Sequence, residues 1–218
     1  MSSWMLSELA QATGQTIEMV LIATFMAAIF GLPLGVLLFT TRSHGVLEGV
    51  RVHRVIGFIV NAIRSIPFII LMVAITPFTR FLVGTSIGTV AAIVPLSVAA
   101  IPFLARLIES ALKEIPFGVI EAAQAMGASS QQIVQKVLLR EALPGMVRAV
   151  TLTLITLVGY SAMAGAIGGG GLGDLGIRYG YQRFELGVMI ATIVVLIVMV
   201  QWLQVLGDWL AAHLRRVS

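Results

Sequence analysis

Long runs of apolar residues dominate the chain, and five of them are long enough to cross a membrane as helices. A transmembrane helix needs about 20 apolar residues, because every backbone amide in the hydrocarbon core must be hydrogen-bonded within the helix. The runs lie at about residues 19–39, 55–75, 87–105, 146–166 and 186–206. The pattern predicts an all-α, polytopic membrane protein with one transmembrane domain over residues 1–218 and its two ends on opposite sides of the membrane.

The composition agrees with this prediction. The chain is 58% hydrophobic and only 11% charged, whereas soluble domains carry about 25% charged residues. The absence of cysteine excludes disulfides, thiolate metal sites and cysteine nucleophiles. The first 16 residues lack the basic region of a cleavable signal peptide, so we expect the first apolar run to stay in the membrane.

Lysine and arginine fall unevenly on the two sides of the predicted spans. One set of loops holds only Arg80, Arg178 and Arg183, and the other holds ten basic residues: Arg42, Arg51, Arg54, Arg106, Lys113, Lys136, Arg140, Arg148, Arg215 and Arg216. Basic residues accumulate in cytoplasmic loops. We therefore expect the N-terminus outside, and residues 106–145 and the C-terminus in the cytoplasm. The net charge of +4 then indicates cytoplasmic loops rather than nucleic-acid binding.

Arg64 is the ionisable residue most clearly embedded in a predicted span. Such a charge is costly unless it faces a wet cavity or a partner, which suggests a function, although snorkelling towards the headgroups explains it equally well. Pro33, Pro67, Pro95 and Pro102 predict kinks, which suit either a pathway or plain packing. The further candidates for a pathway lining are Ser65, Tyr160, Ser161 and Met163, and packing remains an alternative for them.

The stretch "EAAQAMGASSQQIVQKVLLREALPG" from Glu121 to Gly145 interrupts the apolar pattern. The spacing predicts a helix over 115–126 with Pro116 in its first turn and Gly127 in a left-handed conformation at its end. Ser129 and Gln132 have the spacing of a capping box for a second helix. Leu143-Pro144-Gly145 breaks that helix before the fourth span. We refer to residues 106–145 as the insert.

Three interpretations of the insert are open from the residues alone. A helix-turn-helix could bind DNA, but the second helix carries only Lys136 and Arg140, too few to neutralise several phosphates. Two helices folded over the membrane face would explain the amphipathic stripe but not the glycine hinge. A docking element for a soluble partner explains both features.

The pattern Glu121-Ala122-Ala123, three residues, Gly127, and nine residues later the Val137-Leu138-Leu139 region resembles the EAA loop of ABC importer permease subunits. The resemblance implies that the insert docks on an ATPase subunit and passes its ATP-driven closure to the spans. The implied coupling residues are Glu121, Ala122, Ala123, Met126, Gly127, Ala128 and Ser129. The chain departs from the family at Arg140, where the family has proline, and this residue could extend the second helix to Ala142.

Three further segments, "RSIPFIILMVAITPFTR", "GTSIGTVAAIVPL" and "LITLVGYSAMAGAIGGGGLGDLGIRYGY", resemble the methionine-uptake permeases. That resemblance implies a multi-pass protein of the bacterial inner membrane, a homodimer that surrounds the pathway, two ATPase copies, and an extracytoplasmic substrate-binding protein that meets the outer loops. The resemblance also implies contact with membrane lipid and no binding of nucleic acid. A permease for another small amino acid or organic solute would look the same.

Other motifs carry no chemistry. "GLGDLG" at 171–176 matches a dinucleotide-binding pattern but follows a membrane span rather than a strand, and we interpret Gly168 to Gly171 as a mobile outer loop. No P-loop pattern occurs, so ATP and Mg²⁺ would belong to a separate ATPase, and we expect neither a catalytic residue nor a cofactor on this chain. His44, His53 and His213 lack metal-ligand spacing, so we expect no metal.

Overall fold

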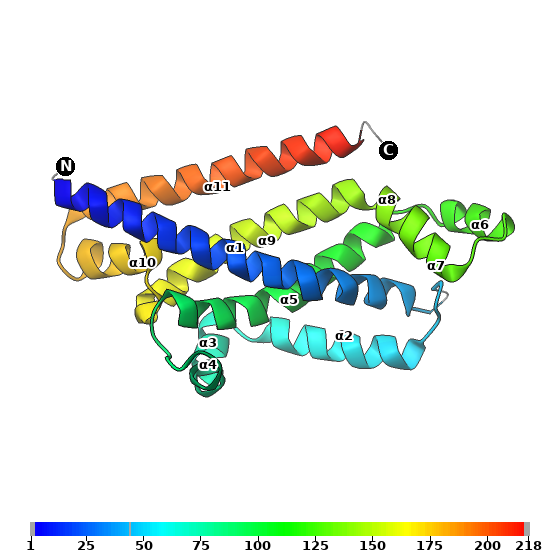
Figure 1. The fold of residues 1–218 in the computed structure, drawn as a ribbon, viewed down its shortest axis with the longest axis horizontal. Coiled ribbons are helices and arrows are strands. Elements are labelled where there is room, and N and C mark those ends of the chain that lie inside the picture. Colours follow the sequence, from blue (N-terminus) through cyan, green and yellow to red (C-terminus); the bar gives the residue numbers. More distant parts are fainter. Residues whose placement is uncertain (1–2, 44, 216–218) are drawn as a thin grey trace.

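The structure, a computed structural model, describes residues 3–43 and 45–215, so that His44 and Arg216 lie outside the described residues. Every regular element in these ranges is helical, which confirms the all-α prediction (Figure 1). Four helices are long and apolar enough to cross a membrane: α1 (Ser3–Thr40), α5 (Thr89–Lys113), α9 (Leu143–Ala164) and α11 (Leu186–Arg215). A bent pair, α2 (Val50–Ser65) and α3 (Phe68–Ala74), makes up to five spans.

The long helices run roughly along one direction, with α1 lying across α5 and α9 (Figure 1). The short helices α6 (Phe117–Ala125), α7 (Ser130–Gln132) and α8 (Leu139–Glu141) lie at one end of the molecule, and α10 (Gly171–Leu175) lies at the other end. The remaining helix, α4 (Thr76–Val83), follows α3. Because α1 begins at the α10 end and α11 finishes at the α6–α8 end, the chain starts and stops at opposite ends.

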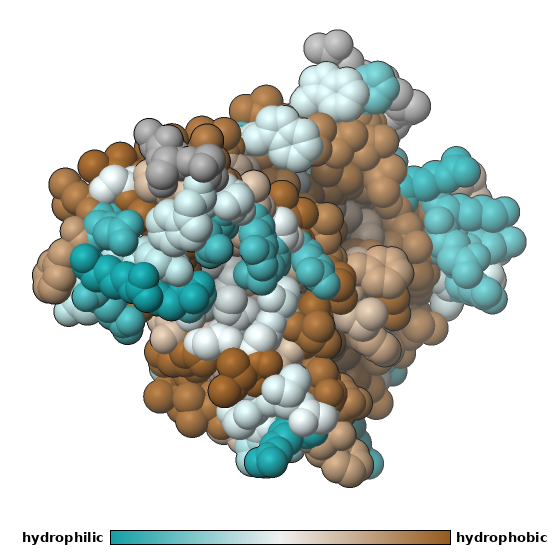
Figure 2. All heavy atoms as spheres, turned by 60° about the vertical axis from the view of Figure 1, so that its left-hand side comes forward, coloured by the Kyte–Doolittle hydropathy of each residue, from teal (hydrophilic) through white to brown (hydrophobic). Residues whose placement is uncertain are grey.

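Helix α5 forms the centre of the core, where Leu96, Leu104 and Ile108 are fully buried. Helix α1 can approach it closely because Gly35 has no side chain: a Cβ there would lie 2.6 Å from the Ala105 carbonyl oxygen. Such small-residue contacts are typical of membrane helices. Helix α11, in contrast, leaves most of its apolar surface exposed. Figure 2 shows hydrophobic residues over much of one face of the molecule, with hydrophilic residues gathered in separate patches.

Four of the five predicted spans differ from the observed helices. Helix α5 continues to Lys113 and α11 to Arg215, beyond the predicted ends at 105 and 206, so residues 106–113 of the predicted insert belong to α5. The first helix begins at Ser3, well before residue 19. The second predicted span is not one straight helix, because α2 and α3 meet at an angle of 100°. Pro67 has no amide hydrogen and disfavours a helical conformation in the preceding residue; Ile66 is accordingly extended, with ψ 124°. The kink predicted at Pro67 is therefore a sharp break.

The predicted mobile outer loop at Gly168 to Gly171 is a packed turn instead. The segment Gly165–Gly169 is broken at Ile167 and Gly168, which have non-helical backbone angles, and it leads through Gly170 into α10. Gly169 and Gly171 are buried. Gly171 has φ +77°, and a Cβ there would lie 2.7 Å from Thr16 Oγ1. The glycines thus permit close packing against α1 rather than free movement.

Candidate coupling insert and pathway residues

Helix α6 presents one face to the core and the other to the surroundings. Ile120 and Ala123 are 3% and 4% exposed within the main hydrophobic core. Glu121, Ala122 and the neighbouring Met126, which is 82% exposed, point outward. The helix begins after Pro116, which caps it with ψ 134° rather than lying in its first turn as predicted. The insert is thereby fixed on one side and free to meet a partner on the other.

Gly127 ends α6 in the predicted left-handed conformation, with φ +79°. The amide of Ala128 donates to the carbonyl oxygen of Ala123 at 3.1 Å, and the amide of Gly127 donates to that of Gln124 at 2.9 Å. These two bonds make a Schellman motif, which satisfies carbonyl groups that a helix end leaves free. No atom lies within 4 Å of a Cβ placed at Gly127, so the glycine is required by backbone conformation and not by crowding.

The second helix of the insert starts at the predicted capping box. The Ser129 hydroxyl accepts from the Gln132 amide at 3.3 Å, and the Gln132 side chain accepts from the Ser129 amide at 2.9 Å. A π-helical segment, Ile133–Leu138, joins α7 to α8. The helix ends at Glu141, and Ala142 serves as its cap, so Arg140 continues the helix nearly as far as expected. The predicted break at Leu143-Pro144-Gly145 is wrong, because these residues already form the first turn of α9.

The coupling candidates therefore form one outward surface with a buried anchor. Glu121, Ala122, Met126, Gly127 and Ser129 are exposed, Ala128 is half-buried, and Ala123 is buried. The prediction missed Phe117, an aromatic side chain that is 52% exposed at the start of α6. Its spacing of four residues from Glu121 places both on one face of the helix, and this spacing could have identified it.

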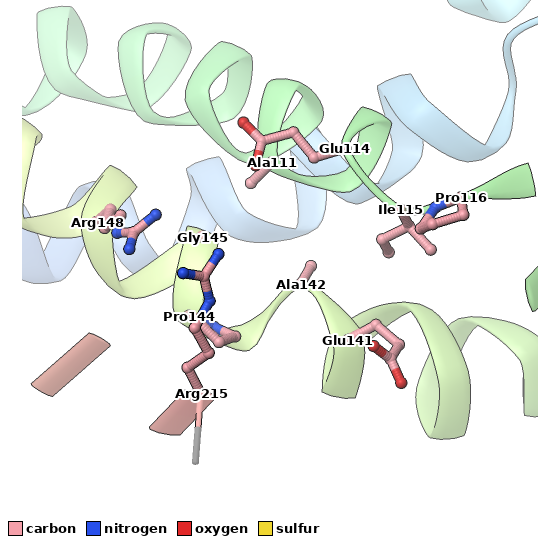
Figure 3. Close-up of a pocket in the computed structure, with 10 residues that line it drawn as sticks. All are labelled: Ala111, Glu114, Ile115, Pro116, Glu141, Ala142, Pro144, Gly145, Arg148 and Arg215. Atoms are coloured by element: carbon pink, nitrogen blue, oxygen red, sulfur yellow. The ribbon is translucent and has the colours of Figure 1, made fainter. Parts of the chain in front are cut away.

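A hollow of about 350 Å³ lies where the insert joins the spans (Figure 3). Residues on both sides of the short helices of the insert line it: Glu114, Ile115 and Pro116 before α6, and Glu141, Ala142, Pro144 and Gly145 after α7. In Figure 3 the Arg148 side chain projects from α9, and the Arg215 side chain at the end of α11 lies beside Pro144 and Gly145. In the described part of the chain, Arg148 and Arg215 have no carboxylate within 4.0 Å. The hollow thus combines free volume with two arginines and two glutamates that form no ion pair among the described residues.

Two of the five pathway candidates meet at the break between α2 and α3. Arg64 and Tyr160 line a hollow of about 160 Å³, together with Phe68 and Phe103. We call it the Arg64 hollow. The Phe68 and Tyr160 rings stack with their centroids 4.5 Å apart. Neither aromatic partner, Phe68 on α3 or Phe103 on α5, was predicted, because only the fold brings four helices together at this point.

The other three candidates do not line the Arg64 hollow. Ser65 is exposed, and its hydroxyl donates to the Asn61 carbonyl oxygen at 2.8 Å. Ser161 is 1% exposed and donates to the Val158 carbonyl oxygen at 2.8 Å, so it is turned into the protein. Met163 is 49% exposed.

Comparison with known proteins supports this arrangement of spans and insert. Residues 31–216 match the family described as the inner membrane component of binding-protein-dependent transport systems. The chain belongs to this family. As a member of it, the protein is a permease subunit of an ABC importer and not itself an enzyme, and the resemblance noted in the sequence is confirmed.

Relatives of this permease carry names that specify a solute. A Vibrio cholerae protein named a probable D-methionine transport system permease protein is 57% identical over 96% of this chain and 92% of its own length. The Escherichia coli K12 protein named a D-methionine transport system permease protein is 56% identical over 76% of each chain. The DNA-binding alternative is not favoured.

Comparison with solved structures agrees with the family assignment. A chain from inward-facing conformations of the MetNI methionine ABC transporter superposes with a TM-score of 0.96, at 51% identity, over 98% of this chain and 99% of that one. A chain of an amino acid ABC transporter superposes with a TM-score of 0.80 at 16% identity, over 95% of this chain and 94% of that one. The second match shows a shared fold only.

Proposed function

We propose that this permease imports methionine by alternating access, driven by ATP that a separate subunit hydrolyses. The observation that carries the proposal is the identity of 51–57% with chains named for methionine transport, which extends over nearly the whole protein in the longest matches. Another small amino acid or organic solute is the alternative, since the 16% identical amino acid transporter shares the fold. The fold therefore does not select the solute.

The insert is the proposed docking site for the ATPase. Glu121, Ala122, Met126, Gly127 and Ser129 provide its outward surface, while Ala123 and Ala128 fix that surface to the core. Because α6 packs into the same core as α5 and α9, a movement of the docked surface would be carried to those spans as a rigid displacement. ATP and Mg²⁺ would bind on the partner, and this chain would contribute no catalytic residue, cofactor or metal ligand.

Two copies of the chain would enclose the pathway, each docking one ATPase, because one set of five spans can hardly surround an alternating channel. The proposed lining residues are Arg64, Ser65, Tyr160 and Met163, all at least partly exposed in a single chain. Ser161, which is buried, would support Tyr160 from behind rather than meet the solute. Residues 1–218 would act as one transmembrane domain.

The proposed orientation places the N-terminus outside and residues 106–145 in the cytoplasm of a bacterial cell. The excess of basic residues on that side supports it. An extracytoplasmic binding protein would deliver the solute to the opposite end, near α10. Lipid would cover the remaining apolar surface.

The test of this function combines uptake with recovery of the partner. Cells that lack their own methionine importer should accumulate radiolabelled methionine when this chain and its ATPase are expressed. Purification of the tagged chain in mild detergent should recover a P-loop ATPase in equal amount, and Glu121→Arg should reduce that recovery together with uptake. Glu48→Arg, the same charge reversal at an exposed residue outside the insert, is the matched control. Uptake of a different solute, or recovery of the chain alone, would overturn the proposal.

A further inference from the structure

Arg64 has no carboxylate within 4.0 Å among residues 3–43 and 45–215. It lies on α2 one residue before the end of the helix, at the break between α2 and α3. A cation at such a depth is costly unless a counter-charge or water reaches it. Arg64 therefore has its full hydrogen-bonding capacity available for a ligand anion.

The surroundings of Arg64 are aromatic and apolar. The Arg64 guanidinium carbon lies 6.0 Å from the centroid of the Phe103 ring on α5. Phe68 and Tyr160, stacked on one another, form a second wall, and Leu71 on α3 adds an aliphatic surface. The Arg64 hollow thus places one cation beside aromatic and aliphatic side chains.

We propose that the Arg64 hollow is a transient binding site for the transported amino acid inside the permease; this inference rests on the proposed function and deepens it. The α-carboxylate would bind the Arg64 guanidinium, whose planar fork matches a carboxylate with two parallel hydrogen bonds. The apolar side chain of the solute would pack against Phe68 and Phe103. A thioether suits this wall, because sulfur makes favourable contacts with aromatic rings.

The size of the Arg64 hollow limits the class of ligand. Its volume of about 160 Å³ is smaller than the roughly 300–1,000 Å³ of sites for drug-sized ligands, which suits a ligand of about the size of one amino acid. Its position at the 100° break between α2 and α3 means that any change in this angle would alter the site.

The experiment measures whether binding depends on the solute carboxylate. The permease–ATPase complex is reconstituted in lipid nanodiscs without binding protein, and binding of radiolabelled L-methionine is measured. The competitor is either unlabelled L-methionine or methioninol, which lacks the carboxylate. We expect methionine to compete at least about tenfold better than methioninol in the wild type, as for a charge-assisted hydrogen bond. Arg64→Gln should reduce this preference to within about twofold, whereas Arg80→Gln, at an exposed arginine on α4, should keep it.

A loss of folding would lower binding of both competitors equally, so the ratio separates recognition from stability. Binding of methionine to the isolated ATPase subunit is measured in parallel and subtracted before the ratio is taken, because this binding is common to all variants. Phe103→Ala should weaken the binding of methionine more than the binding of alanine, because only the methionine side chain is long enough to contact the aromatic rings. An unchanged ratio in Arg64→Gln, or no saturable binding that responds to Arg64, would overturn the site while leaving methionine uptake intact. Uptake of another solute would overturn the proposed function instead.

Discussion

Arg106 on α5 donates a hydrogen bond from Nη2 to the backbone carbonyl oxygen of Gly57 on α2, at 3.0 Å. Its Nη1 is 2.5 Å from Glu109 Oε2, and Lys113 Nζ is 2.6 Å from Glu109 Oε1. Glu109 is only 1% exposed. Since α2 buries only Gly57 and Val60, this ionic cluster is a principal tie between α2 and the helix that leads into the insert.

Glu109→Ala should destabilise the protein by about 3–5 kcal/mol, because it leaves Arg106 with an uncompensated charge in a largely buried position. The double variant Arg106→Met with Glu109→Leu should recover most of this loss, since apolar residues of similar volume replace a buried ion pair at little cost. Thermal unfolding of the purified protein in detergent, followed by tryptophan fluorescence, measures both. A double variant as unstable as Glu109→Ala would contradict the argument.

Gly127→Val should abolish transport while the spans still insert. A residue with a Cβ costs about 1–2 kcal/mol in the left-handed conformation, and the Schellman motif that aims α7 would open. Gly118→Ala is the matched control in the same insert: Gly118 lies in helical backbone with no atom within 4 Å of an added Cβ, so this change should be neutral or slightly stabilising. Uptake and membrane content are measured together, and normal uptake by a well-inserted Gly127→Val protein would reject the hinge.

Thr16→Val should cost about 1–3 kcal/mol, because it leaves the buried amide of Leu172 without an acceptor. In the native structure Thr16 Oγ1 accepts from that amide at 2.9 Å. Thr13→Val tests the same chemical change where the hydroxyl bonds only within its own helix, to Leu9, and should shift stability by less than about 0.5 kcal/mol. The comparison is made by thermal unfolding in detergent. Equal effects of the two changes would show that the hydrogen bond from Leu172 to Thr16 does not contribute to stability.

Gly207→Leu should separate α9 from α11, because a Cβ at Gly207 already overlaps the Thr151 side chain. Overpacking of this kind costs about 1–3 kcal/mol. Gly187→Leu, at the other end of α11, meets only the Met5 methyl carbon at 3.9 Å from the added Cβ and serves as the control. Crosslinking between cysteines introduced on α9 and α11 reports the separation, and the natural chain has no cysteine to interfere. Unchanged crosslinking in Gly207→Leu would contradict the close approach.

The sequence predicts the parts of this structure that depend on local chemistry. Hydropathy locates the spans, and the caps at Gly127 and Ser129 follow from residue types whose preferred conformations are known. Hydropathy does not specify the direction in which a helix runs, however, so it could not predict the 100° bend after Ser65. Ser161 is polar and next to Tyr160, but adjacent helical residues are 100° apart, and only packing decides which of them faces inward. The Arg64 hollow needs residues from α2, α3, α5 and α9, which no local pattern brings together.

The caps of α10 come from the opposite end of the chain. The amides of Gly171 and Leu172, the first two of α10, donate to Gln15 Oε1 at 2.8 Å and to Thr16 Oγ1 at 2.9 Å. Each of these hydrogen bonds joins residues 156 positions apart in the sequence. During synthesis the N-terminal helix therefore enters the membrane long before its polar partners exist. The hydrogen bonds from α10 to Gln15 and Thr16 form only after the last quarter of the chain has begun to be made, so α1 and α10 join late in the biogenesis of the protein.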